Sequence, residues 1–485
     1  MSVLLSLSSE VGCQSVTGLS VSEFFQYHYS VIGKLTGSLS VALPSHYEGL
    51  RSLGIGQYGS EREEYSIVSD FVAIHKPHSP SLEERTYTYK PNNKIVGNKP
   101  LEVGYYYSFQ HLGTEEEMAG SRWCLPLSAE RLPIEVDKVV FARDQLSGLL
   151  RDEGLPFQKA ARVINKVDSE YGRVKYISPL VDLYDNLLIV TKLRPGMKVY
   201  QMYEGEQKPT GRAKVYGDTP LHLQKSELRK SYNPRTGENF EKTVNPIFSI
   251  PSNETVTTEG ELQNGKAVIF QMHRWNNLLI EGERGHYMGD KPFDLVSVLV
   301  IDAKTAELVF DKEMFIAIWG KNRAERATDQ IRQDYRSRYD IEPNNRFNKQ
   351  QLLMDKYQTP IVEHLDAWVF VVCLANWLLY TASDEVEFVC QKWEKYLPES
   401  KNAKNDNQRK TIAQTRKAAK NLFHFSITKK RIFYLTLCIV YFFRKTQPHT
   451  TFPTEYRHFK KKKNGSQKND PRHTKPTHRP MPCPR

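Results

Sequence analysis

Cysteine is scarce in this sequence, and its spacing argues against a structural zinc site. The 485 residues include six cysteines, none of which forms a C-x-x-C pair or a cysteine–histidine cluster with zinc spacing. Scattered thiols of this kind favour a reducing compartment, with each cysteine packed in the interior. The start of the chain also lacks a basic segment before its apolar residues, so the sequence predicts no signal peptide.

Long apolar runs are also missing. The two most apolar stretches, "AWVFVVCLANWLLY" (367–380) and "IFYLTLCIVYFF" (432–443), are both shorter than the roughly 20 residues that span a bilayer. The first predicts a buried helix, and we expect no membrane partner. The second is unusual because it lies inside a strongly basic segment.

Acidic residues are nearly absent from the end of the chain. Residues 401–485 contain 22 Lys and Arg but only 3 Asp and Glu, whereas residues 1–400 carry a net charge of −7. A near-neutral body with a basic tail favours a polyanionic partner, most often nucleic acid. The alternative is a solvated, partly disordered tail without a specific role.

The residues that are present predict an α/β fold with a β-rich insertion. Apolar and β-branched runs predict three antiparallel strands, a helix over 140–166 and a further strand, and helical spacing begins near Thr328. A hairpin is expected over 293–320, with breaks in the later helical region near Pro343 and Pro360. The expected segments are a short helical N-terminal part (1–62), a core (63–194 and 295–400), the insertion (195–294) and the tail (401–485).

One helical segment, "YRSRYDIEPNNRFNK" (335–349), has an unusual polar face. At 100° per residue, five side chains fall within a narrow wedge, where a helix normally carries apolar residues: Tyr335, Arg338, Glu342, Arg346 and Lys349. This wedge indicates a face turned toward a charged substrate. The alternative is an ordinary solvated helix face.

Three carboxylates at the ends or faces of separate elements suggest a metal site. Asp70 lies in the first predicted strand, Asp168 directly follows an apolar stretch, and Glu342 lies in the polar wedge. Hard divalent cations such as Mg²⁺ prefer carboxylate oxygens. Asp70 could instead be a strand-end residue and Asp168 part of an Asx-turn, while Asp182 and Asp185 compete for the place of Asp168.

The same residues resemble a known family. Tyr335, Arg338, Glu342 and Lys349 match the pattern Y-x2-R-x3-E-x6-K, and "VSDFVAI" and "VDSEYG" resemble its two Asp motifs. The chain is similar in these motifs to the DD-E transposases of bacterial insertion sequences, in the subgroup with a β-rich insertion before the catalytic Glu. The resemblance extends over about residues 20–425.

The resemblance implies a ribonuclease-H-like fold, a mixed sheet flanked by helices, and a transposase that carries out metal-dependent DNA cleavage and strand transfer. It implies two Mg²⁺ or Mn²⁺ ions and the catalytic, metal-binding residues Asp70, Asp168 and Glu342. It also implies DNA contacts from Tyr335, Arg338, Arg346, Lys349 and Trp275. The expected partners are double-stranded DNA, as terminal inverted repeats and target, and a second copy in the DNA complex. The expected location is the bacterial cytoplasm, associated with the nucleoid.

Some features depart from this family pattern. Pro343 directly follows Glu342 and predicts a kink or a new helix start there, and the residues from about 426 onward have an unusual composition. We therefore expect a weakly active or decayed copy. A tryptophan such as Trp275 is more often a core residue than a base-stacking one. Two alternatives stay open, a metal-dependent nuclease of the same fold and a catalytically inactive DNA-binding relic.

Overall fold

The structure is a computed structural model of the whole chain. It describes residues 28–383 except 29, 60, 91–99, 115–122, 195, 233–236, 238 and 263–264, and also residues 4, 7–8, 14–19, 386 and 412–425. Residues Met1–Thr446 form one compact unit. The second apolar run (432–443) and all of the tail beyond Phe425 lie outside the described residues.

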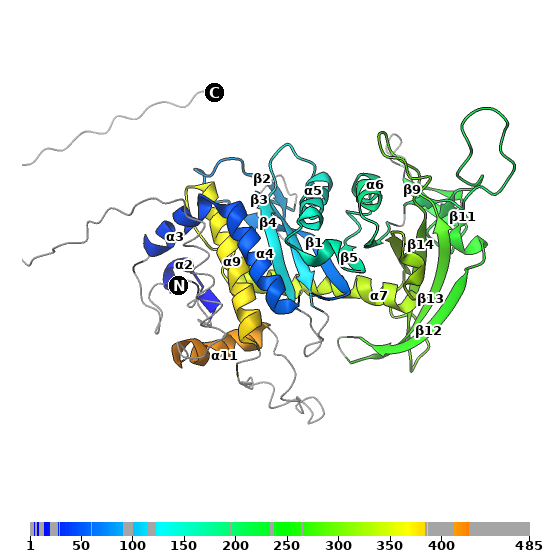
Figure 1. Cartoon of the computed structure of the whole chain (residues 1–485). Coiled ribbons are helices and arrows are strands. Elements are labelled where there is room, and N and C mark those ends of the chain that lie inside the picture. Colours follow the sequence, from blue (N-terminus) through cyan, green and yellow to red (C-terminus); the bar gives the residue numbers. More distant parts are fainter. Residues whose placement is uncertain are drawn as a thin grey trace, which may run out of the picture. The chain divides into compact units, whose positions relative to one another are not determined.

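A large mixed sheet organises the described part of the chain (Figure 1). Its ten strands include a central group in the order β4-β3-β1-β5-β6, in which β1 is antiparallel to β3 and parallel to β5. β3 also pairs antiparallel with β4, and β5 pairs parallel with β6. The bounds are β1 Glu64–His75, β2 Thr86–Tyr89, β3 Leu101–Gly113, β4 Cys124–Arg131, β5 Arg162–Val167 and β6 Leu187–Lys192.

The three early strands confirm the antiparallel arrangement that the sequence predicts. β2 and β3 pair from Thr86–Gly104 to Tyr89–Leu101, and β1 pairs with the other edge of β3. The predicted helix over 140–166 is wrong in its second half. Helix α5 (Lys138–Arg151) ends there, and the chain passes through Gly154 and Pro156 into strand β5, because neither residue favours a helix interior.

Helices cover both faces of the central strands. α5 and α6 (Val174–Leu183) lie on one face, where Gln145 and Tyr176 contact side chains of β3 and β5. α7 (Thr328–Ser337) and α8 (Ile341–Gln350) lie on the other. There Ile331 and Tyr335 of α7 join an apolar cluster with residues of β5, β6, β13, β14 and β15.

Helix α9 (Val362–Ala382) forms the centre of the main hydrophobic core. It is longer than the apolar run in the sequence and, among the described residues, is the one helix long and apolar enough to cross a membrane. However, 89% of its most apolar window is buried inside the protein, as in the core helix of a soluble protein. It packs against β4 and against α3 (Ser30–Ser40), α4 (Leu43–Tyr58) and α11 (Ile412–Phe425) (Figure 1).

The regular elements described within residues 195–294 are mostly strands. Some form small separate sheets, whereas β12, β13 and β14 extend the main sheet beyond β15, which pairs with β6. The predicted hairpin is present as β14 and β15, with Ala306 in a positive-φ turn between them. The bounds are β7 Lys198–Val199, β8 Leu221–His222, β9 Leu228–Tyr232, β10 Asn239–Thr243, β11 Asn245–Pro246, β12 Glu254–Glu261, β13 Ala267–Leu278, β14 Phe293–Asp302 and β15 Met314–Trp319.

Candidate active site

The pairing of β1 with β5 brings two of the predicted carboxylates together. Ser69 is the last residue of β1 that pairs with β5, and its partner is Val167. The next position along the two parallel strands is Asp70 beside Asp168. Because neighbouring strands lie about 4.8 Å apart, the two backbones are close at this point. The two carboxylates, far apart in sequence, are therefore neighbours in the fold.

Asp70 is held in an environment that disfavours its charge. The pKa of Asp70 is raised to about 6, mainly by burial and also by nearby Asp168 and Glu342. Arg338 and the backbone N–H of Phe71 act in the opposite direction. The Asn345 side chain donates a hydrogen bond to Asp70 Oδ2 over 3.3 Å. In the described part of the chain, Asp70 forms no salt bridge, so its charge is only partly compensated.

A break between two helices aims Arg338 at these carboxylates. After α7 the chain forms the 3-10 turn η4 (Arg338–Asp340) and then α8. The Arg338 side chain is buried and lies 4.6 Å from the ring centre of Tyr339. Its guanidinium pKa is raised by Tyr335, Asp168 and Asp70, against the opposing effect of burial. Arg338 is thus a cation that lies near both aspartates.

Glu342 lies near the two aspartates and Arg338, but its side chain is largely exposed. Its side chain is 55% exposed, and its Oε1 lies 3.5 Å from Arg338 Nη2. Among the residues that the structure describes, no three His, Cys, Asp or Glu side chains are arranged to hold a metal ion. Glu342 pairs with Arg338 and also acts on the charge of Asp70, so the convergence of the three carboxylates on one metal site stays a prediction.

The remaining two cations of the wedge differ in exposure. Lys349 is half-buried, and burial lowers the pKa of its ammonium group, whereas Asp355 and Asp70 oppose this shift. Lys349 therefore lies near Asp70 on the last turn of α8. Arg346 is exposed, one turn earlier. Both cations therefore lie on α8, Lys349 half-buried near Asp70 and Arg346 exposed.

The two aromatic residues expected at the DNA surface lie in the core instead. Tyr335 is 1% exposed and packs in the apolar cluster beneath α7. Trp275 is also 1% exposed, donates to the carbonyl oxygen of Ile250 over 3.3 Å and meets Phe248 edge to face. A base could stack on this indole only after the side chain left the core. The predicted wedge requires one unbroken helix, whereas η4 separates Tyr335 from the wedge residues on α8.

Other acidic residues near Asp168 in sequence are placed elsewhere. Asp182 pairs with Lys291 at 3.0 Å and Asp185 with Lys321 at 2.6 Å, and both are largely exposed. Sequence reasoning missed Asn345, which contacts Asp70. Its position three residues after Glu342 puts it on the same side of α8, and this spacing was the signal available.

Comparisons with known proteins give little guidance. No family model matches this chain, and no curated protein matches it. Among solved structures, it is similar to a piggyBac transposase in a synaptic complex with hairpin DNA, with 10% sequence identity and a TM-score of 0.32. The likeness covers 93% of this chain and 76% of that chain. At this TM-score, fold and function rest on the chain's own residues.

Proposed function

We propose that this protein is a DD-E transposase that cleaves DNA at insertion-sequence ends and transfers the strands in a metal-dependent reaction. The observation that carries this proposal is the juxtaposition of Asp168 with Asp70 by strand pairing, with Arg338 directed at both. Glu342 comes to the same place from α8. The mixed sheet with helices on both faces supports the ribonuclease-H-like fold that the sequence resemblance implies.

The donor set fits a hard divalent cation. Asp70, Asp168 and Glu342 offer only carboxylate oxygens, which suit Mg²⁺ or Mn²⁺. Asp70 is the strongest indication, because a carboxylate that is costly to ionise gains most from a cation. Two such ions, when bound, activate the attacking oxygen and stabilise the leaving one. These three residues would hold the ions.

The cations of the wedge would bind the DNA backbone. Arg338 presents a planar guanidinium that can contact a phosphate through two N–H groups, whereas Lys349 acts as a point charge. Exposed Arg346 would contact phosphates further along α8. Arg338 Nε is buried and has no hydrogen-bond partner within the described residues, so it retains a donor for an incoming oxygen.

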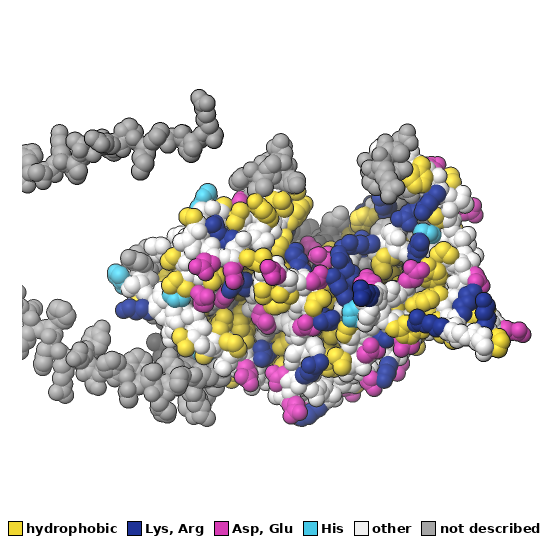
Figure 2. Space-filling view, turned by 90° about the horizontal axis from the view of Figure 1, so that it is seen from above, with side chains coloured by type: hydrophobic (Ala, Val, Ile, Leu, Met, Phe, Trp, Pro, Cys, Tyr) yellow, Lys and Arg dark blue, Asp and Glu magenta, His cyan; other side chains and the backbone are white. Residues whose placement is uncertain are grey.

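The proposed partner is double-stranded DNA, as terminal inverted repeats and as target. Figure 2 shows Lys and Arg side chains gathered near the middle of one face of the protein, although residues 1–400 carry more acidic than basic residues. Such a local concentration attracts phosphates independently of the net charge. A second copy of the chain would act in the DNA complex.

The test uses a labelled duplex that carries the inverted repeats flanking the gene, with Mg²⁺. Asp70→Asn, Asp168→Asn and Glu342→Gln should each abolish cleavage and preserve DNA binding, because the amide keeps the shape but removes the charge. Asp185→Asn is the matched control and should cleave normally. Cleavage without strand joining would indicate a nuclease, and DNA binding without cleavage by the natural protein would indicate a relic.

A further inference from the structure

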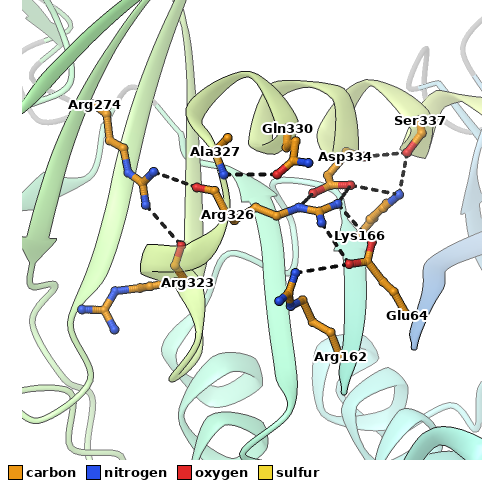
Figure 3. Close-up of polar contacts among 10 residues, drawn as sticks. All are labelled: Glu64, Arg162, Lys166, Arg274, Arg323, Arg326, Ala327, Gln330, Asp334 and Ser337. Carbon is orange, nitrogen blue, oxygen red and sulfur yellow. Dashed lines mark hydrogen bonds and ion pairs between the residues drawn. The ribbon is translucent and has the colours of Figure 1, made fainter. Parts of the chain in front are cut away.

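Lys166 connects the strand of Asp168 to the helix that precedes Arg338. It lies in β5 two residues before Asp168, and its side chain is only 6% exposed. Its Nζ donates to Ser337 Oγ over 2.8 Å and lies 3.4 Å from Asp334 Oδ1 (Figure 3). Ser337 is the last residue of α7, and Arg338 follows it directly.

The same cluster also reaches β1, the strand that carries Asp70. Arg326 binds both carboxylate oxygens of Asp334, at 2.8 Å and 2.9 Å. Arg326 also binds both oxygens of Glu64, at 2.9 Å and 3.1 Å (Figure 3). Glu64 is the first residue of β1. The network therefore ties α7 to both strands whose ends bear the predicted catalytic aspartates.

Apolar packing alone would leave the end of α7 less well defined. Ile331 and Tyr335 bury the helix against the sheet, but such contacts have no preferred direction. A buried ammonium group, by contrast, must keep its acceptors at fixed distances, because its desolvation is costly when they are lost. Lys166 thus specifies where the final turn of α7 lies along β5.

We propose that Lys166 is a positioning residue: it fixes the junction of α7 and η4 on β5, and so holds Arg338 and Glu342 beside Asp168. The geometric part of this inference stands on the contacts of Lys166 itself. Only its consequence for metal binding rests on the proposed function.

The test compares Lys166→Met with Lys291→Met in the full chain. Lys291 is an equally buried lysine, 7% exposed, and pairs with Asp182 and Asp290 away from this junction. Lys166→Met should fold, because Asp334 keeps its two bonds to Arg326. Without metal, amide hydrogen exchange over 338–350 should rise at least tenfold in Lys166→Met and stay unchanged in Lys291→Met. Lys166→Arg, which keeps the charge and the donors, should restore most of the protection.

A calorimetric Mn²⁺ titration supplies a second measurement. Lys166→Met should bind Mn²⁺ at least tenfold more weakly, with Lys291→Met close to the natural protein. A folded Lys166→Met with unchanged exchange over 338–350 would overturn the inference. If it does not fold, Ser337→Ala, which removes only the nearer acceptor, should show the same local rise, and its absence would be equally decisive. Failure of the natural protein to bind Mn²⁺ would count against the proposed function, and the exchange result would then decide the positioning role alone.

Discussion

Asp70 is a residue whose ionisation costs the fold stability. Its carboxyl group lies in a half-buried position on β1, with Arg338 as a compensating cation and two other carboxylates close by. A packing role alone does not require an acid there. The raised pKa is thus a sign of a site as well as of burial.

Replacing Asp70 should make the protein more stable at neutral pH. The folded-state pKa of about 6 exceeds the ordinary value of 3.8, so the folded protein holds this proton more tightly than the unfolded chain. The stability that comes from this tighter proton binding is fully present below about pH 4 and is lost as the pH rises through 6. In metal-free buffer at pH 7, Asp70→Asn should therefore raise the free energy of unfolding by about 3 kcal/mol.

Urea denaturation at pH 4 and pH 7 measures this effect. The gain should fall to less than about 1 kcal/mol at pH 4, where the folded natural protein carries a neutral side chain at position 70. An equal gain at both pH values would show that the change of shape, not the charge, is responsible.

At the residue scale, spacing predicted which residues lie near one another better than it predicted their exposure. Asp168 and Arg338 lie near Asp70, as their motifs suggested. Tyr335 and Trp275 are core residues because the apolar surfaces of α7 and β13 need large side chains to fill them. Burial of this kind depends on which elements meet, and single-sequence spacing does not contain that information.

At the scale of elements, the turn η4 separates Tyr335 from the later residues of the predicted polar wedge. The wedge assumes one regular helix from Tyr335 to Lys349, but three residues of 3-10 geometry interrupt it. Pro343 is the third residue of α8, in the first turn, where a backbone N–H has no partner within the helix. The sequence predicts a break at Pro343, whereas the break in the structure is η4, which lies before the proline.

Pro343→Ala should have a small effect on stability. Because no hydrogen bond of α8 is lost to the proline, the free energy of unfolding should change by less than about 1 kcal/mol. Activity should likewise stay close to that of the natural protein. Thermal denaturation together with the cleavage assay tests this, and a large gain in activity would revive the view that Pro343 misplaces Glu342.

The pairing of β1 with β5 has its own polar clamp on the opposite face of the sheet. Asn165 is fully buried, donates to Ser69 Oγ over 2.9 Å and to the carbonyl oxygen of Ile67 over 3.3 Å. It also accepts a bond from the Tyr176 hydroxyl over 2.8 Å. These contacts fix the register that places Asp168 beside Asp70.

Asn165→Val should destabilise the protein by about 2–4 kcal/mol, because several buried polar groups lose a partner. Asn239→Val, at an exposed strand position, is the matched control and should change stability by no more than about 0.5 kcal/mol. Chemical denaturation of both variants gives the comparison. Equal effects at the two positions would contradict a clamp at Asn165.

At the scale of the whole molecule, the sequence predicted individual strands but not the order in which they pair. The strands of the core and the β-rich character of 195–294 follow from local composition. The continuation of one sheet through β15 into β14, β13 and β12 does not, because it depends on pairing between β6 and a strand more than a hundred residues later. Long-range pairing of this kind leaves no local signature.

The basic tail should supply sequence-independent affinity for DNA. Residues 444–485 contain 12 Lys and Arg and 2 Asp and Glu. Removing them should flatten the slope of log K against log salt concentration by roughly 0.9 for each phosphate contact that is lost. Fluorescence anisotropy with a random duplex at several salt concentrations measures the slope. An uncharged segment of equal length is the control, and an unchanged slope after truncation would exclude this role.

Because β6 pairs with β15, which is synthesised much later, one edge of β6 stays unpaired during part of synthesis. β6 is buried and apolar, and the strand that completes its outer edge is Met314–Trp319. At about 5–20 residues per second, a ribosome takes on the order of 6–25 s to make the intervening chain. Throughout that interval the edge of β6 is open to pairing with other chains. Yield in the cell should therefore depend on chaperones that shield the nascent chain, even though β15 pairs with Ile189–Lys192 in the finished sheet.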